Sequence, residues 1–319
     1  MTGVPDAASR YRGAMLGLAA GDALGTTLEF RPPGTFEPVS DIVGGGPFGL
    51  APGEWTDDTS MALCLAESLI ESRGFDPADQ MSRYLLWRDT GYMSSNGRCF
   101  DIGNTVGAAL CRYAQSGDPF AGDADPCHGG NGSLMRLAPV PLAFSRDPVT
   151  AIELSGEMSR TTHAAPEPVD ACRYYAALIV GALAGVSKSI LLGPRFHPAR
   201  GAFARGELVA AIDRVAAGSF HERRPPRIRG SGYVVDAIEA ALWAFAGTDD
   251  FRTGALAAVN LGDDADTTGA IYGELAGAYY GEAGIPLSWR QRLRHADRIR
   301  SMADALLDLS AFIAPDRGS

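Results

Sequence analysis

The chain has 319 residues, of which 46% are hydrophobic and 21% charged, with a net charge of −10 and a pI of about 5.0. This is the composition of a globular protein with a sizeable core, and its acidic balance argues against non-specific binding to nucleic acid. Five scattered cysteines without a CxxC motif predict reduced thiols, a cytoplasmic location and no zinc framework. The N-terminus lacks an apolar signal core, and the longest apolar run, residues 176–186, is too short to cross a membrane.

The first predicted helix, residues 7–25, carries glycine at every fourth position, and so does a late one, residues 264–281. Glycine costs a helix about 1 kcal/mol relative to alanine, so each stripe needs a structural reason such as the close approach of another backbone. We predict that the two striped helices pack against each other; the alternative is that each packs separately against large side chains. The stripes are Gly13, Gly17, Gly21 and Gly25, and Gly269, Gly273, Gly277 and Gly281.

A loop rich in proline and glycine, residues 31–54, separates the first helix from the second. Its length without periodicity favours a functional role. It ends at Thr56-Asp57, where either residue is a candidate N-cap for a helix over 57–72. Further helices are predicted over 77–90, 102–115, 147–160, 167–187, 206–217, 232–246, 250–259, 264–281 and 296–313. No stretch has a β-strand pattern, so we predict an all-α fold with residues 1–319 in a single domain.

Two helix starts far apart in the sequence each crowd acidic and hydroxyl side chains together. Like charges about 4 Å apart repel by roughly 4 kcal/mol at an effective dielectric of 20, and a helix N-terminus supplies only about half a compensating charge. We therefore predict that a divalent metal lies between them, and the oxygen ligands without nearby His or Cys favour Mg²⁺, Mn²⁺ or Ca²⁺ over zinc. The alternative is two well-capped helices with solvated acids. The predicted ligands are Thr56, Asp57, Asp58, Asp264, Asp266 and Thr267.

Other polar residues have simpler explanations when each is taken alone. Asp101 is most simply an N-cap or first-turn acid, and Asp22 is explained by a bond to its own turn. A lone histidine such as His163 is more often a core or capping residue than a catalyst. Glu29 lies near a helix end, where an acid opposes the dipole, which favours another role. The glycine-rich turn at 129–133 suits a phosphate but lacks the lysine of a P-loop.

Together these motifs resemble the ADP-ribosylglycohydrolases, most closely the branch of the dinitrogenase reductase-activating glycohydrolase. The similarity extends from about residue 10 to residue 281, nearly the whole chain. The motifs that carry it are GDALG (21–25) with Glu29, WTDDTS (55–60), FDIGNT (100–105), GNGSLMR (130–136), TTH (161–163), SGYVVDAIEAALWAF (231–245) and GDDADTTGAIYGELAGAYYG (262–281).

The resemblance implies an all-α fold with a cleft that holds two divalent cations, Mg²⁺ or Mn²⁺, on the six ligands named above. It also implies that Asn131, Gly132 and Ser133 lie along the diphosphate of ADP-ribose. Asp101 matches an acid at the scissile ribose, and His163 matches a position that borders the site, as does Glu29. One departure is Asp263, where many members of the family have glycine.

By this resemblance the protein is expected to remove ADP-ribose from a modified protein, most simply from arginine, and to release free ADP-ribose. The candidates for proton transfer are Asp101, then Glu29, then Asp58, since a metal-bound carboxylate is a weak base. Alternative substrates are serine-linked ADP-ribose, O-acetyl-ADP-ribose and an ADP-ribosylated nucleobase. Another alternative is an immunity protein against an ADP-ribosylating toxin. No nucleic-acid partner and no membrane span are expected.

Overall fold

The computed structural model describes residues 4–203 and 206–314, and its regular structure is helical. Within these residues the only β pairings are isolated bridges, such as that between Arg31 and Asp263, which confirms the all-α prediction. The α-helices are α1 (Ala7–Gly25), α2 (Asp57–Ser72), α3 (Pro77–Thr90), α4 (Asn104–Ser116), α5 (Pro139–Ala143), α6 (Pro148–Arg160), α7 (Pro166–Leu183), α8 (Lys188–Leu191), α9 (Ala210–Ala216), α10 (Ser219–Glu222), α11 (Val234–Ala246), α12 (Phe251–Val259), α13 (Ala265–Tyr280), α14 (Leu287–Arg292) and α15 (Ala296–Phe312). Short 3₁₀ segments are η1 (Thr26–Leu28), η2 (Leu134–Arg136) and η3 (Glu282–Gly284).

The predicted helices are present, but several have different bounds. The helix expected from residue 102 begins at Asn104, the one expected over 206–217 covers Ala210–Ala216, and α7 ends at Leu183 rather than at 187. Helices α5, α8, α10 and α14 were not separately predicted. They have four to six residues, which is too few to produce a hydrophobic period.

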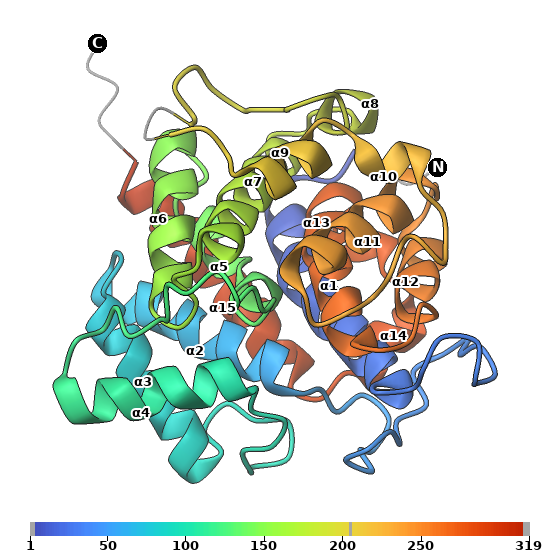
Figure 1. The fold of residues 1–319 in the computed structure, drawn as a ribbon, viewed down its shortest axis with the longest axis horizontal. Helices are drawn as coiled ribbons and strands as arrows, with labels where there is room; N and C mark the ends of the chain where they lie inside the picture. The colour runs from blue at the N-terminus through green and yellow to red at the C-terminus, as the bar shows by residue number, and fades with distance from the viewer. Residues whose placement is uncertain (1–3, 204–205, 315–319) are drawn as a thin grey trace.

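Helices α1 and α13 form an antiparallel pair at the centre of the molecule (Figure 1). Three glycines of one stripe face three of the other, and a Cβ atom built on Gly17 would lie 2.2 Å from the carbonyl oxygen of Gly273. The same distance separates a Cβ on Gly13 from the carbonyl oxygen of Gly277. The two backbones therefore approach more closely than any side chain allows. The prediction that the striped helices pack together is confirmed.

This pairing brings the end of α1 beside the beginning of α13. A Cβ atom on Gly25 would lie 2.3 Å from the carbonyl oxygen of Ala265, the first residue of α13. Beyond α1, the backbone N–H of Phe30 donates to the carbonyl oxygen of Asp263 at 2.7 Å, and the Asp263 N–H donates to that of Arg31 at 2.8 Å. The segment that follows α1 is thus tied to the acidic segment that precedes α13.

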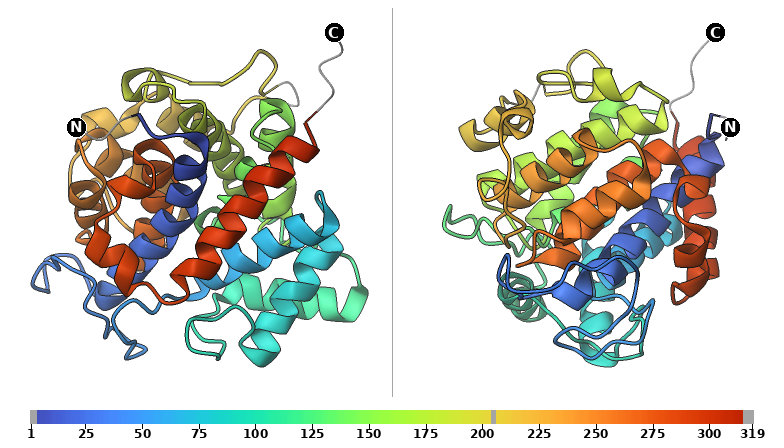
Figure 2. Two further views of the ribbon diagram at one scale, coloured as in Figure 1. Left: turned by 180° about the vertical axis from the view of Figure 1, so that it is seen from behind. Right: turned by 90° about the vertical axis from the view of Figure 1, so that its right-hand side faces the viewer.

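The other helices surround this pair. Figure 2 shows α15 lying along α1, while α11 and α12 pack against α13. Helices α2 to α4 form a group at one side, and α5, α6 and α7 connect that group to the central pair. The buried side chains form one large apolar cluster that includes Trp55, Tyr175, Phe251 and Trp289. Among the described helices, none combines the length and apolarity needed to cross a membrane.

Alanine at Gly17 is expected to lower the free energy of unfolding by about 1–3 kcal/mol or more, because a methyl group would press directly on the α13 backbone. Gly107 in α4 provides a matched control, since a Cβ atom there would meet only the Ile102 side chain, at 3.9 Å. Gly107→Ala is expected to be neutral or to stabilise the protein by up to about 1 kcal/mol. Urea denaturation of both variants measures the difference, and equal effects would contradict the close packing of α1 on α13.

Candidate active site

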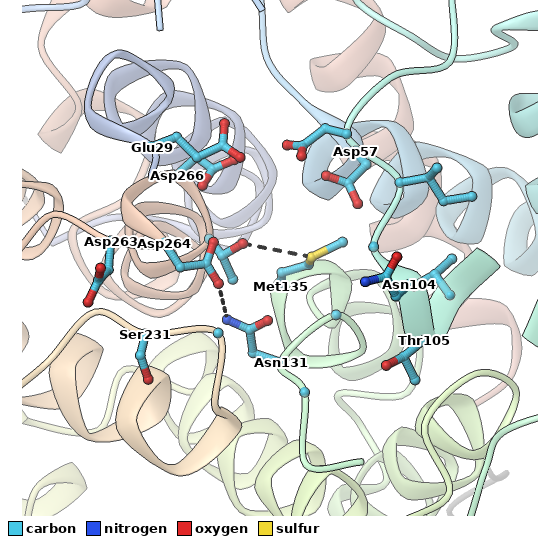
Figure 3. A pocket seen from close by; sticks show the side chains of 18 of the residues that line it. Glu29, Asp57, Asn104, Thr105, Asn131, Met135, Ser231, Asp263, Asp264 and Asp266 are labelled. Carbon is cyan, nitrogen blue, oxygen red and sulfur yellow. Dashed lines mark hydrogen bonds between the residues drawn. The ribbon is translucent and has the colours of Figure 1, made fainter. Parts of the chain in front are cut away.

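Acidic residues from four parts of the chain line one cavity of about 730 Å³. The segment after α1 contributes Glu29, the start of α2 contributes Asp57, and the segment before α4 contributes Asp101. The start of α13 contributes Asp264 and Asp266, and Figure 3 shows Asp266 beside Glu29 and across the cavity from Asp57. The two helix starts that the sequence singled out therefore do converge.

Asp22 of α1 holds the start of α2 in place. Its Oδ1 accepts hydrogen bonds from the Thr56 backbone N–H at 2.9 Å and from the Thr56 hydroxyl at 3.0 Å. Its Oδ2 accepts from the Thr59 N–H at 3.1 Å and from the Thr59 hydroxyl at 2.6 Å. Asp22 was expected to bond its own turn, and that expectation was wrong. Asp22, which belongs to α1, accepts the backbone hydrogen bonds at the N-terminus of α2. Thr56 occupies the N-cap position of α2, but its side chain makes no capping hydrogen bond.

The clustered carboxylates are buried rather than solvated. The exposed fraction is 5% for Asp57, 1% for Asp58 and Asp266, and 3% for Glu29. Carboxylate oxygens of Glu29, Asp101 and Asp266 lie within 4.8 Å of one another. One buried oxygen each of Glu29, Asp58 and Asp266 accepts no hydrogen bond from the described residues. The alternative of capped helices with solvated acids is therefore wrong.

Burial changes the protonation of this cluster. It raises the pKa of Asp57, Asp58 and Asp266 well above 3.8, and the neighbouring carboxylates raise it further. Burial, the main cause, also raises the pKa of Asp101 to about 7, and burial together with the charge of Asp101 raises that of Glu29 to about 10. These acids cannot all be ionised at neutral pH unless positive charge lies among them. Either protons or cations must fill that role.

Two aspartates differ from what their sequence positions suggested. Asp101 was expected to cap the following helix, but α4 has Gly103 at its N-cap position, and Asp101, at φ +60°, lines the acidic cavity instead. Asp263 also has a left-handed backbone, at φ +54°, a conformation that is uncommon outside glycine. Figure 3 shows its side chain directed away from Asp264 and Asp266. Asp263 therefore lines the cavity without joining the cluster.

The glycine-rich turn forms another wall of the cavity through Gly130, Asn131 and Gly132. The Asn131 side-chain N–H donates to Asp264 Oδ2 at 2.7 Å, which links this wall to the acidic cluster (Figure 3). The turn leads into a 3₁₀ segment and the five-residue helix α5 rather than a long helix. Ser133 differs from its neighbours, because its hydroxyl lies 2.8 Å from the Ser159 hydroxyl in the core. Its side chain is not directed toward the substrate position expected from the sequence.

Comparison with known proteins identifies the family. A family profile described as ADP-ribosylglycohydrolase matches residues 4–313. The chain belongs to the ADP-ribosylglycohydrolase family. It is 40% identical, over 98% of its length and 82% of the relative's, to a protein of Serratia proteamaculans named ADP-ribosylarginine hydrolase Tri1. It is 35% identical, over 98% of its length and all of the relative's, to the ADP-ribosyl-[dinitrogen reductase] glycohydrolase of Rhodospirillum rubrum.

A solved structure titled "ADP-ribosylglycohydrolase-related protein complex" matches with 47% identity and a TM-score of 0.83, covering 96% of this chain and 99% of that one. The resemblance that the motifs indicated is thus confirmed, and the matched region contains every segment of the cavity described above. The fold is that of the ADP-ribosylglycohydrolases.

Two buried charged residues behind the ADP-ribosylglycohydrolase site were missed in the sequence. Glu274 of α13 is fully buried and accepts a hydrogen bond from the backbone N–H of Ala138 at 2.8 Å, which secures the start of α5. Arg136 is fully buried and contacts Gly132 and Thr162. The sequence did offer a signal, because each residue is a charged side chain within an otherwise apolar or glycine-striped segment. A charged side chain in such a segment is rarely buried unless it has a specific partner.

Proposed function

We propose that this protein hydrolyses the N-glycosidic bond that joins ADP-ribose to an arginine side chain of a modified protein, and that it does so with two divalent cations. The orphaned buried carboxylate oxygens carry this proposal, because they leave a negative site that only cations or protons can neutralise. The arginine linkage is supported by the relatives named ADP-ribosylarginine hydrolase, one of them 44% identical, from Pseudomonas putida.

The residues present fit Mg²⁺ or Mn²⁺. The proposed ligands are all hard oxygen donors, and unpartnered oxygens of Asp58 and Asp266 lie at the meeting point of α2 and α13. When bound, the cations supply a Lewis acid for the ribose hydroxyls and lower the pKa of water. The residues that would hold them are Thr56, Asp57, Asp58, Asp264, Asp266 and Thr267.

Proton transfer falls to carboxylates that face the cavity. Cleavage of the C–N bond releases a guanidine, and water that adds to the ribose carbon gives up one proton, so one proton must move from the water to the leaving guanidine. Asp101 suits this transfer because its pKa of about 7 lets it accept and return a proton near neutral pH. Glu29, with a pKa of about 10 before cations bind, is the second candidate. Asp58 comes last, as a proposed metal ligand that does not line the cavity.

The remaining proposed contacts place the substrate. The wall formed by Gly130, Asn131 and Gly132, with His163 beside it, is proposed to contact the diphosphate of ADP-ribose. The acidic residues at the other wall suit a leaving group that carries positive charge, as the arginine guanidinium does. A serine or acetyl leaving group has no such charge.

The test is release of free ADP-ribose from two protein substrates, one modified on arginine and one on serine, each with Mg²⁺, with Mn²⁺ and with EDTA. The expected result is release from the arginine-linked substrate only, in the presence of metal. Release from the serine-linked substrate alone would move the proposal to an O-glycosidic substrate. Full activity after metal removal and in EDTA would overturn the metal-dependent chemistry.

A further inference from the structure

Arg136 lies directly behind the glycine-rich wall of the cavity and is completely buried. One guanidinium nitrogen donates to the carbonyl oxygen of Gly132 at 2.7 Å, and another donates to the Thr162 hydroxyl at 2.6 Å. The guanidinium stacks over the Tyr84 ring at 4.8 Å and contacts no carboxylate among the described residues. A buried cation without a counter-ion is costly, so its position next to a substrate wall calls for an explanation.

The contacts of Thr162 fix the direction of its hydroxyl hydrogen. An arginine N–H can only donate, so the Thr162 oxygen accepts the bond from Arg136. The same oxygen lies 2.8 Å from Nδ1 of His163, which is its only other side-chain or backbone partner in the described structure. If Nδ1 carried a proton, the buried Thr162 hydroxyl hydrogen would have no acceptor, which is unfavourable for a buried donor. The Thr162 hydroxyl therefore donates to Nδ1, and the proton of the ring lies on Nε2.

The protonated nitrogen of His163 faces the cavity wall. A Cβ atom on Gly130 would lie 3.3 Å from Nε2, and one on Gly132 would lie 3.2 Å from it. His163 itself lines the cavity. Burial, together with the positive charge of Arg136, lowers the pKa of His163 to about 3, so the ring is neutral. A neutral ring with its proton on Nε2 presents a single N–H donor toward the cavity.

Arg136 also orients the peptide that follows Gly132. The C=O and N–H of a trans peptide point in opposite directions. Because the Gly132 carbonyl points at Arg136, the N–H of Ser133 points away from Arg136, and it donates to no acceptor within the described residues. Ser133 itself is fully buried and does not line the cavity, so Arg136 fixes the backbone of the glycine-rich wall there and orients one cavity donor, the His163 Nε2–H.

We propose that Arg136 and Thr162 are positioning residues that hold His163 as a neutral Nε2–H donor, so that this donor meets a diphosphate in the cavity. The inference rests on the proposed function for the identity of the diphosphate, which is that of ADP-ribose. The buried charge of Arg136 adds a favourable potential for the anion without contacting it.

The first test reads the tautomer directly. Long-range ¹H–¹⁵N correlation spectra of the full-length protein distinguish protonated from unprotonated histidine nitrogens, and loss of one set of signals in His163→Asn assigns the residue. The expected result is a proton on Nε2 and none on Nδ1 in the wild-type protein. A proton on Nδ1 would overturn the proposal whatever reaction the protein catalyses.

The second test uses conservative variants and the binding of free ADP-ribose, measured by calorimetry. Thr162→Val removes the hydroxyl and is expected to abolish the pure Nε2–H form and to weaken ADP-ribose binding at least tenfold, which corresponds to about 1.4 kcal/mol. Thr162→Ser retains the hydroxyl and is expected to keep both properties. Arg136→Met is expected to resemble Thr162→Val. If Arg136→Met does not fold, the comparison of Thr162→Val with Thr162→Ser is sufficient for the test.

Thr161 offers a matched control in the adjacent position. It is also fully buried, and its hydroxyl bonds to the Met158 carbonyl oxygen and to the Gln80 side chain rather than to His163. Thr161→Val is expected to leave the His163 tautomer and the affinity for ADP-ribose unchanged. Equal losses in Thr161→Val and Thr162→Val, or no recovery in Thr162→Ser, would show a purely structural role. Since the readouts are a spectrum and a dissociation constant, failure to hydrolyse the arginine linkage would leave this test intact.

Discussion

Asp266→Asn is expected to lower kcat/KM for release of ADP-ribose by about 10³-fold or more. Asp266 lies where α2 and α13 meet, with one oxygen 3.2 Å from the Thr56 hydroxyl oxygen and the other without a partner among the described residues. The amide keeps the shape of the side chain but removes the charge that the proposed cations need. Loss of metal-dependent stabilisation of the transition state is worth several kcal/mol, and each 1.4 kcal/mol is about tenfold in rate.

The same substitution is expected to stabilise the protein in EDTA. Without cations, Asp266 is a buried acid surrounded by Glu29, Asp58, Asp101 and Asp264, so it must either retain a proton or repel these neighbours. The amide of asparagine requires neither. If the variant loses activity while its metal-free form melts at a higher temperature than the wild type, Asp266 acts as a metal ligand. A residue needed for the structure would lower the melting temperature when it is replaced. Retained activity, or unfolding of the variant, would contradict this interpretation.

Asp308→Asn on the exposed surface of α15 is the matched control. It makes the same change of charge and shape far from the acidic cluster in the fold. We expect it to change neither the activity nor the metal-free stability measurably.

The central part of the fold could be predicted because its cause is local and repeated. Glycines at four-residue spacing on the two helices leave room for one backbone against the other, and Gly21 and Gly269 are one of three resulting glycine pairs. In the structure, the antiparallel register and the bridge between Arg31 and Asp263 bring Glu29 to the start of α13. The convergence of the two acidic helix starts followed from the chemistry of their side chains.

The rest of the site depends on contacts between distant segments, which sequence patterns do not carry. Asp22 caps a helix that begins 35 residues later, although Asp57 and Thr56 look like sufficient local caps. Asp101 precedes α4 as a cap would, but the left-handed backbone there directs it into the cavity. In both cases local propensity predicts a cap from the residues next to the helix start. The structure instead uses contacts between segments that are distant in the sequence.

The metal-free protein is expected to lose stability as the pH rises from about 5 to 8. The pKa of Asp101 is about 7 and that of Glu29 about 10 in the folded protein, against ordinary values of 3.8 and 4.5. Between the ordinary and the folded pKa, the folded protein retains protons that the unfolded chain has released. The free energy of unfolding is therefore highest below about pH 4 for these groups, and it falls by roughly 1.4 kcal/mol per pH unit for each retained proton. The fall continues up to pH 7 for Asp101 and further for Glu29.

Bound cations should reverse this dependence, because they replace the protons and bind the ionised carboxylates more tightly as the pH rises. At a metal concentration 100 times the dissociation constant, each site adds about 2.7 kcal/mol to the free energy of unfolding. Denaturant titrations at pH 5 and pH 8, in EDTA and in Mn²⁺, measure both effects. Stability in EDTA that is flat or rises with pH would show that the cluster does not hold protons. Asp266→Asn should flatten the slope in EDTA as well as weaken the effect of Mn²⁺, since protons and cations compete for the same buried oxygens.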